Sequence, residues 1–313
     1  MIGLGFVYLL AGIMFALFAG LTLADAAHPR RIGTAAFWGL VALSFLAGDR
    51  LGDLGNGVLV VVLVTLAGAG ALGRSAPQTS TVEERLAEAA HRRNRLFIPA
   101  LIVPATALGG TFLFKAVPGI VETKQVTLVS LALGVLLALA ACYAWLRPRA
   151  AAPFQEGRRL MDAVGWAAVL PQMLAALGAV FALAGVGEIV GGLAGAAIPQ
   201  GSRIVAVAAY GVGMALFTIV MGNAFAAFPV MTAAIAIPLL IRGDGGDPAV
   251  IAAIGMLCGF CGTLLTPMAA NFNIVPAALL ELKDRNGVIR AQVATAIPLL
   301  AINIMLIWWF GFD

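Results

Sequence analysis

The sequence predicts an all-α, polytopic membrane protein. Of its 313 residues, 62% are hydrophobic and only 11% are charged, and the mean hydropathy is +1.02; soluble domains carry about 25% charged residues. Apolar runs of roughly 17 to 25 residues, enough to cross about 30 Å of hydrocarbon, recur along the chain. Because backbone polar groups in hydrocarbon must bond within the protein, we expect these runs to be helices.

Seven of these runs are expected as ordinary membrane spans. They cover residues 2–24, 32–48, 54–73, 96–114, 126–146, 161–184 and 289–310. The first run lacks the basic leader and small-residue cleavage site of a signal peptide, so we expect it to remain as a span. With the segments between them included, the sequence predicts about eight spans plus a re-entrant helical hairpin and a broken helix.

The loops between the spans alternate in charge. Basic side chains gather at 28–31, 74–95, 147–159 and 283–290. Loops rich in Lys and Arg face the cytoplasm, so we expect a multi-pass protein of the cell (inner) membrane with both termini outside. The net charge of +4 is then explained by loops that orient the protein in the lipid bilayer, so no nucleic-acid partner is expected.

The longest polar segment, 74–95, predicts a short cytoplasmic helix. Thr81 and Glu84 have the spacing of a capping box, and helix-forming residues follow them. The basic residues of this segment fit a topology anchor better than a site for an acidic partner or lipid.

Residues 204–241 form an uncharged run that is too long for one span. As a single helix, its 38 residues would measure roughly 57 Å, nearly twice the hydrocarbon thickness. The chain is expected to turn at Gly222 and Asn223, because glycine adopts unusual backbone angles and asparagine can bond its own backbone. Two full spans and a re-entrant hairpin both fit, since both return the chain to the same side.

A second run without charge, 248–280, has 33 residues and would measure roughly 50 Å as one helix. Within the segment 248–282, Thr266-Pro267 disfavours helix and removes a backbone donor, while Asn271 and Asn273 are poor helix-interior residues. An unpaired peptide group costs several kcal/mol in hydrocarbon, so a break is expected only where it is buried in protein or lines a wet cavity.

Together the two breaks predict a binding site of the discontinuous-helix type. In such sites half-helices begin near the membrane midplane with their positive ends toward an anionic group, while freed carbonyls can coordinate a cation. Neither run contains a charged side chain, which favours a small, singly charged or polar substrate over a dication or a polyanion. The candidate substrate-binding residues are Gly222, Asn223, Ala224, Thr263, Thr266, Pro267, Asn271 and Asn273. Asn273 could equally cap the second half-helix, and in an alternative interpretation these polar residues only join helices.

Other motifs are weaker. Cys258 and Cys261 have a C-x-x-C spacing but lie in an apolar run without further Cys or His partners, so no metal site is expected. Glu188 is a proton-coupling candidate, although an interfacial surface position suits it better. The sequence has no intramembrane His, Ser/His/Asp set or paired carboxylates, so we expect no enzyme, no catalytic residues and no cofactor.

Two segments resemble a known family. They are "GNAFAAFPVMTAAIAIPLLI" at 222–241 and "GFCGTLLTPMAANFNIVPAALLELKD" at 259–284, and they resemble signature segments of the larger subunit of the two-component bacterial 5-oxoproline (pyroglutamate) transporters. The resemblance covers essentially the whole chain and is densest from Arg158 to the carboxyl terminus. More distantly, the arrangement resembles the ion transporter superfamily of secondary carriers, including the divalent-anion/sodium symporters.

The resemblance implies an elevator-type carrier with a scaffold and a moving transport domain, built from two inverted repeats. In the wider superfamily each repeat has a re-entrant hairpin with a Ser-Asn-Thr tip and a broken helix with a Gly-Thr-Pro-type break. Gly262-Thr263, Thr266-Pro267 and Asn271 match the second pattern. At the hairpin, Gly222-Asn223-Ala224 keeps the asparagine but lacks both hydroxyls, so the resemblance does not extend to the sodium site of the dicarboxylate carriers.

The chain contains one hairpin and one broken helix, with only weak further candidates at Gly55-Asn56-Gly57 and at 104–111. An inverted-repeat carrier needs two facing sets, so we expect half a carrier, with scaffold-like helices in 1–150 and the transport-site half in 151–313. The other half is expected from a smaller membrane subunit of the same transporter or from a second copy of this chain, and a higher oligomer stays open.

The expected function is secondary active uptake of a small organic acid, with 5-oxoproline as the first candidate. The coupling ion, sodium or proton, stays open. The alternative is an accessory membrane subunit that stabilises a partner carrier without binding substrate.

Overall fold

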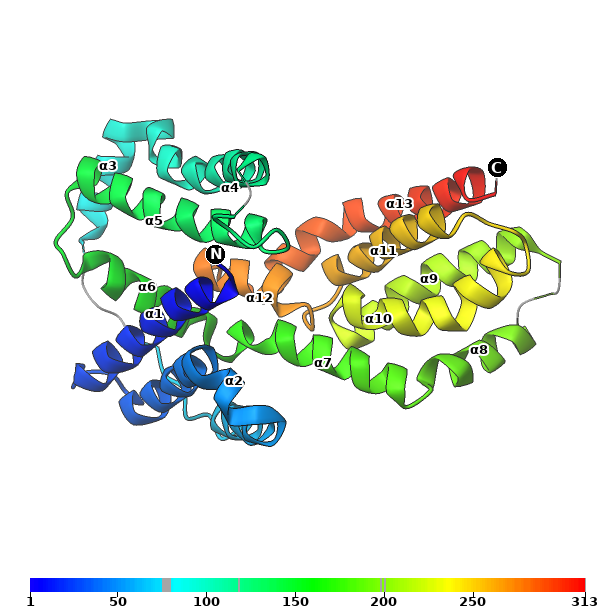
Figure 1. Cartoon of the computed structure of the whole chain (residues 1–313), viewed down its shortest axis with the longest axis horizontal. Helices are drawn as coiled ribbons and strands as arrows, with labels where there is room; N and C mark the ends of the chain where they lie inside the picture. Colours follow the sequence, from blue (N-terminus) through cyan, green and yellow to red (C-terminus); the bar gives the residue numbers. More distant parts are fainter. Residues whose placement is uncertain (75–79, 118, 198, 200, 313) are drawn as a thin grey trace. The chain divides into compact units, whose positions relative to one another are not determined.

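The computed structural model describes residues 1–74, 80–117, 119–197, 199 and 201–312. Its described part is all-α (Figure 1), and the β-type pairing found there is an isolated bridge between Ile2 and Val121. The chain forms two compact units, Met1–Gly165 and Trp166–Asp313. The boundary that we expected at residue 150 lies one helix before this division.

The first unit is built from two packed helix pairs and two shorter helices. Its helices are α1 (Leu4–Ala24), α2 (Arg31–Gly68), α3 (Val82–Arg92), α4 (Ile98–Ala116), α5 (Val126–Leu146) and α6 (Ala152–Val164). Helix α1 packs against α2, and α4 packs against α5. The capping box at the start of α3 is confirmed: Thr81 Oγ1 accepts from Glu84 N, and Glu84 Oε2 accepts from Thr81 N. Residues 75–79 of the expected polar segment lie outside the described residues.

Helix α2 contains two of the expected spans, because the chain reverses direction at Gly52. This residue has a φ of +63°, which glycine adopts without steric cost. The two halves then run antiparallel: Gly73 N donates to Thr34 Oγ1 at 2.8 Å. At the turn, Asn56 Nδ2 donates to the carbonyl oxygens of Gly48 and Gly52, so the carbonyls freed by the reversal are bonded.

The second unit contains the remaining helices. They are α7 (Leu170–Leu183), α8 (Val186–Ala197), α9 (Arg203–Met221), α10 (Ala224–Met231), a π-helix (Thr232–Ile241), α11 (Pro248–Leu264), α12 (Ala270–Leu279) and α13 (Gly287–Phe310). The expected span at 161–184 is wrong as a single helix. Gly165, with a φ of +59°, ends α6, and a short 3₁₀ turn precedes α7.

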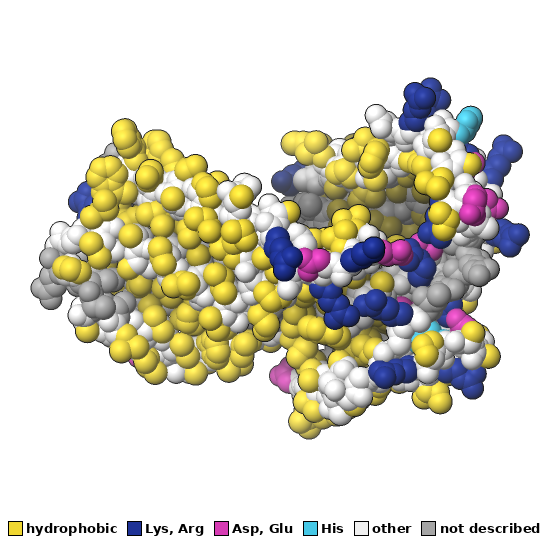
Figure 2. All heavy atoms as spheres, turned by 180° about the vertical axis from the view of Figure 1, so that it is seen from behind, with side chains coloured by type: hydrophobic (Ala, Val, Ile, Leu, Met, Phe, Trp, Pro, Cys, Tyr) yellow, Lys and Arg dark blue, Asp and Glu magenta, His cyan; other side chains and the backbone are white. Residues whose placement is uncertain are grey.

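Seven helices in the described part of the chain are long and apolar enough to cross a membrane. Hydrophobic side chains also cover most of the visible surface of the second unit (Figure 2, left). On α9, for example, Leu216 and Val220 are exposed. Exposed apolar surface on this scale is unfavourable in water and suits lipid. The chain is therefore a multi-pass membrane protein.

In the second unit, α9 and α11 both start beside the carboxyl end of α13. The Arg203 guanidinium lies 4.5 Å from the centre of the Phe312 ring, and Asp247 N donates to Gly311 O at 2.8 Å. Further along, Gly211 of α9 lies against Ile304 of α13. Both helices thus run alongside α13 toward its middle.

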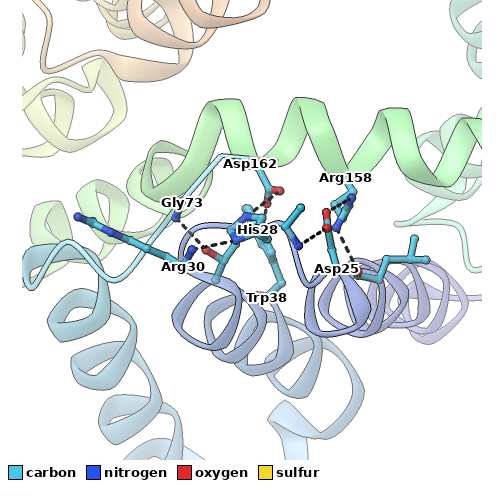
Figure 3. A network of polar contacts seen from close by, with 10 residues as sticks. Asp25, His28, Arg30, Trp38, Gly73, Arg158 and Asp162 are labelled. Atoms are coloured by element: carbon cyan, nitrogen blue, oxygen red, sulfur yellow. Dashed lines mark hydrogen bonds and ion pairs between the residues drawn. The ribbon is translucent and has the colours of Figure 1, made fainter. Parts of the chain in front are cut away.

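In the first unit, α6 is fastened to the end of α1 by a buried arginine (Figure 3). Arg158 is 2% exposed, and it donates from Nη1 to Leu21 O at 3.1 Å and from Nη2 to Asp25 Oδ2 at 2.9 Å. The last four carbonyls of a helix have no partner within it and carry partial negative charge. Arg158 therefore caps α1 and pairs with the carboxylate that follows it.

One turn further along α6, Asp162 fastens the helix to the start of α2 (Figure 3). Its Oδ1 accepts from Trp38 Nε1 at 2.8 Å, and its Oδ2 lies 3.7 Å from His28 Nε2, with both side chains fully buried. His28 Nδ1 accepts from Arg30 N, so in the neutral ring the proton is on Nε2 and faces Asp162. These contacts hold α1, α2 and α6 together.

Asp25→Asn is expected to lower the melting temperature of the purified protein at pH 7. Burial raises the pKa of Asp25, but hydrogen bonds from Arg158 and Ala27 and the charges of Arg158 and His28 together hold it below its ordinary value of 3.8. A carboxylate with a lowered folded-state pKa stabilises the protein above its unfolded pKa, and this contribution disappears as pH falls through the folded pKa. The difference between wild type and variant should be constant from pH 7 to about pH 5 and shrink below pH 3.8.

The control is Asp284→Asn. Asp284 pairs with Arg290 at the same distance, 2.9 Å, but both side chains are exposed, and exposed pairs contribute little. A loss of melting temperature as large as that of Asp25→Asn would contradict the assigned role of the Arg158 pair.

Candidate functional site

The turn between α9 and α10 is built from two of the expected residues. Gly222 ends α9 in the left-handed region with a φ of +75°, and Asn223 caps α10 by accepting from Phe225 N at its Oδ1, at 2.8 Å. Ala224, the first residue of α10, is fully buried. The helical reversal predicted at Gly222 and Asn223 is confirmed.

The break between α11 and α12 spans Leu265–Ala269. Thr266 Oγ1 donates to Ile219 O at 2.9 Å and accepts from Met268 N at 3.2 Å. Thr263 Oγ1 donates within α11, to Phe260 O at 2.6 Å. Both threonines are buried, whereas Pro267 is exposed. The predicted break at Thr266-Pro267 is therefore present, and a threonine ties it to the last turn of α9.

Asn273 closes the break from the α12 side. It is fully buried, and its Nδ2 donates to Thr263 O at 2.8 Å and to Thr266 O at 2.7 Å. These are carbonyls that the interrupted helix leaves without intrahelical partners. Asn271, two residues earlier, is exposed. The two asparagines of α12 thus have different environments: the Asn273 side chain reaches into the break, and Asn271 lies on the surface of the described chain.

The two breaks touch each other. A methyl group added to Gly222 would lie 2.6 Å from Met268 O, and the Thr266–Ile219 hydrogen bond lies alongside this contact. The structure therefore brings the hairpin turn and the helix break, which are over 40 residues apart in sequence, into one junction. No side chain larger than hydrogen fits at Gly222.

An apolar groove of about 330 Å³ runs beside this junction. Its walls come from α11, α12 and α13: Leu257, Phe260, Cys261, Thr263, Leu264, Phe272, Leu299 and Asn303. Thr263 is the expected site residue that lines it. Leu299 and Asn303 lie near the middle of α13, so the junction sits beside the middle of that helix.

Asn303 and Cys261 are groove residues that the sequence analysis did not select. Asn303 Nδ2 donates to Cys261 Sγ at 3.6 Å. The described residues contain no group of three or more His, Cys, Asp or Glu side chains arranged for a metal ion. Glu188 is exposed in the first turn of α8, where a carboxylate interacts favourably with the helix dipole.

A sequence signal distinguishes Asn273 from Asn271. Ala269, Ala270, Asn273 and Ala277 are all buried, and their spacing of three and four residues is that of one helix face. Asn273 lies on this small-residue face, and Asn271 lies off it. This periodicity is present in the sequence and would have indicated that Asn273, and not Asn271, is buried.

Gly222→Ala is expected to destabilise the protein more than Gly245→Ala. The two glycines have nearly equal φ values, +75° and +72°, so the left-handed backbone costs each variant about 1–2 kcal/mol. Open space surrounds Gly245, whereas the new methyl at position 222 collides with Met268 O, and overpacking adds about 1–3 kcal/mol. Thermal unfolding in detergent measures both, and equal losses would contradict the tight junction.

Comparison with known families places the chain in one of them. Comparison with curated proteins and with solved structures found no match. A family model described as "Protein of unknown function (DUF979)" matches residues 5–312, nearly the whole chain. This multi-pass membrane protein belongs to the DUF979 family.

Proposed function

We propose that the chain is a subunit of a secondary active transporter that takes up a small organic acid, 5-oxoproline first, across the cytoplasmic membrane. The observation that carries the proposal is the junction at which the hairpin turn at Gly222 meets the helix break at Met268. Irregular backbone at membrane depth is tolerated where it is buried in protein or lines a cavity, and this junction does both.

The position of the junction along α13 supports a site near the membrane midplane. Helix α13 has 24 residues and measures about 36 Å, enough to cross about 30 Å of hydrocarbon. Leu299 and Asn303, which share the groove with Thr263, lie near its centre. The hairpin of α9 and α10 thus turns beside the middle of α13, as a re-entrant hairpin would. Its two arms, Arg203–Met221 and Ala224–Ile241, are each also long and apolar enough to cross a membrane, so two full spans fit as well.

The electrostatics of the junction favour a small monoanion. Helices α10 and α12 both begin there, and the amides of a first helical turn carry partial positive charge. Residues 204–241 and 248–280 contain no charged side chain, so helix ends and neutral side chains provide the binding groups. A carboxylate on a compact polar ring matches this arrangement.

The elevator mechanism gives each compact unit a role. Met1–Gly165, in which charged side chains hold α6 against α1 and α2, is the scaffold. Trp166–Asp313, which contains the junction, is the transport domain. The assignment draws on the resemblance to the two-component 5-oxoproline transporters. The outward-facing apolar surface of the second unit suits a domain that moves through lipid.

A partner subunit completes the site in this proposal. In the described residues, a helical hairpin and a helix break that both lack charged side chains occur together in the second unit. The turn of α2 at Gly52 is flanked by the charged residues Asp49, Arg50 and Asp53, which suit an aqueous end of a span. Helix α4 runs on through 104–111 despite Pro104. The smaller membrane subunit, or a second copy of this chain, supplies the facing half-site.

Thr266→Ala and Asn271→Ala are expected to reduce uptake of radiolabelled 5-oxoproline at least about tenfold. The first variant loses a hydroxyl that is bonded within the junction, and the second loses an exposed amide in the first turn of α12, next to the break. The measurement is initial uptake by cells that contain equal amounts of inserted protein. Thr65→Ala is the control and should retain uptake, since Thr65 belongs to the first unit and its Oγ1 donates within its own helix to Val61 O. Wild-type uptake by both Thr266→Ala and Asn271→Ala would contradict the site.

Proteoliposomes that contain the chain together with the smaller subunit are expected to transport, and liposomes with either component alone are not. An inverted-repeat site needs both facing halves. Sodium and proton gradients are imposed separately, so the same assay identifies the coupling ion. Equal transport without the smaller subunit would overturn the half-carrier arrangement, and tolerance of replacement at both Asn223 and Asn271 would favour the accessory-subunit alternative.

A further inference from the structure

The orientation of the buried Asn273 amide is fixed by its partners. Both contacts, Thr263 O and Thr266 O, are backbone carbonyls, which only accept hydrogen bonds. The group that faces them must therefore be the NH₂ group. The amide oxygen points away from both and has no hydrogen-bond partner in the described part of the chain.

An unpaired acceptor at this position is costly. Asn273 is fully buried, and a buried polar atom without a partner destabilises a protein. The cost is higher in surroundings of low dielectric constant. The Asn273 amide has a bonded NH₂ group and an unbonded oxygen. A binding site keeps such an acceptor unbonded when its ligand supplies the hydrogen-bond donor.

The ligand group that fits Asn273 Oδ1 is an N–H donor rather than a metal cation. A sodium ion needs several oxygen ligands, and three backbone carbonyls at the junction are already bonded by side chains. Thr263 O and Thr266 O accept from Asn273, and Ile219 O accepts from Thr266. Asn273 Oδ1 is a buried acceptor without a partner in the described part of the chain, as is Thr218 Oγ1 in the last turn of α9. A lone amide oxygen suits one hydrogen-bond donor.

Building on the proposed function, we propose that Asn273 Oδ1 accepts the ring N–H of a lactam substrate and so determines which cyclic acids are transported. In 5-oxoproline the N–H adjoins the carbon that carries the carboxylate. One edge of the ring therefore presents an anion to the first turns of α10 and α12 and a donor to Asn273. Thr263 and Phe272, a partner and a chain neighbour of Asn273, line the groove of about 330 Å³. Asn273 itself is fully buried and is not part of the groove wall, so contact with a substrate requires a local movement that opens a path from the groove.

The test compares two competitors that differ in one ring atom. Uptake of radiolabelled 5-oxoproline is measured in cells that contain the full chain with the smaller subunit, against unlabelled 5-oxoproline or its lactone, 5-oxotetrahydrofuran-2-carboxylate. The lactone replaces N–H by an oxygen, which would face Asn273 Oδ1 as a second acceptor. It is expected to inhibit about ten- to a hundredfold more weakly than the lactam.

Variants identify the residue responsible. In Asn273→Ala the ratio of the two inhibition constants is expected to fall to about one, because the acceptor is gone. In Thr266→Ala, which loses the bond to Ile219 O but keeps the Asn273 amide, the ratio is expected to stay at the wild-type value. A purely structural role of Asn273 would lower uptake without changing the ratio. Where a variant transports too slowly, ligand-dependent thermal shifts of the purified complex give the same ratio.

The outcomes separate the two proposals. Saturable 5-oxoproline uptake with equal inhibition by lactam and lactone would overturn the role of Asn273 and leave the proposed function standing. Absence of 5-oxoproline uptake and binding by the wild-type complex would overturn both. The comparison of lactam and lactone uses the wild-type complex alone. The proposal can therefore be tested even if Asn273→Ala does not fold. A preserved ratio in a folded Asn273→Ala would also overturn it.

Discussion

The second unit depends on one constraint: a helix that stops inside an apolar layer must bond its own freed peptide groups. At the break after α11, a single buried amide satisfies two carbonyls, Thr263 O and Thr266 O. The Thr266 hydroxyl then ties the same break to α9 through Ile219 O. The free energy lost to each unpaired peptide group would be several kcal/mol, so these short hydrogen bonds make the discontinuity of α11 and α12 stable.

The two units place their polar groups in opposite ways. In the first unit, charged side chains fasten α6, with Arg158 capping α1 and Asp162 holding Trp38. In the second unit, the junction uses only amide, hydroxyl and backbone groups. Ionised groups are costly in hydrocarbon, which agrees with a neutral junction in an apolar unit. In the proposed function, helix ends and single amide atoms, such as the oxygen of Asn273, therefore provide the substrate selectivity.

Much of the fold follows from length and periodicity. The expected run 126–146 coincides with α5, and the run 289–310 lies within α13, because a helix with every backbone group bonded is the stable form of an apolar segment. The run 161–184 failed for a local reason. Gly165 takes a positive φ that ends α6, and hydropathy does not register a backbone angle. Gly52, also at a positive φ, divides α2 into two antiparallel spans, in agreement with the separate runs expected at 32–48 and 54–73.

The sequence by itself determined where the helices must break. Runs of 38 and 33 uncharged residues exceed the hydrocarbon thickness, and Gly222 and Pro267 mark the points of least helical stability. Only the tertiary structure decided that the two breaks touch, and that Asn273 rather than Asn271 enters the junction. Contact between Gly222 and Met268 depends on the parallel course of α9 and α11 beside α13, and this packing is set by side-chain shape across helices that are distant in sequence.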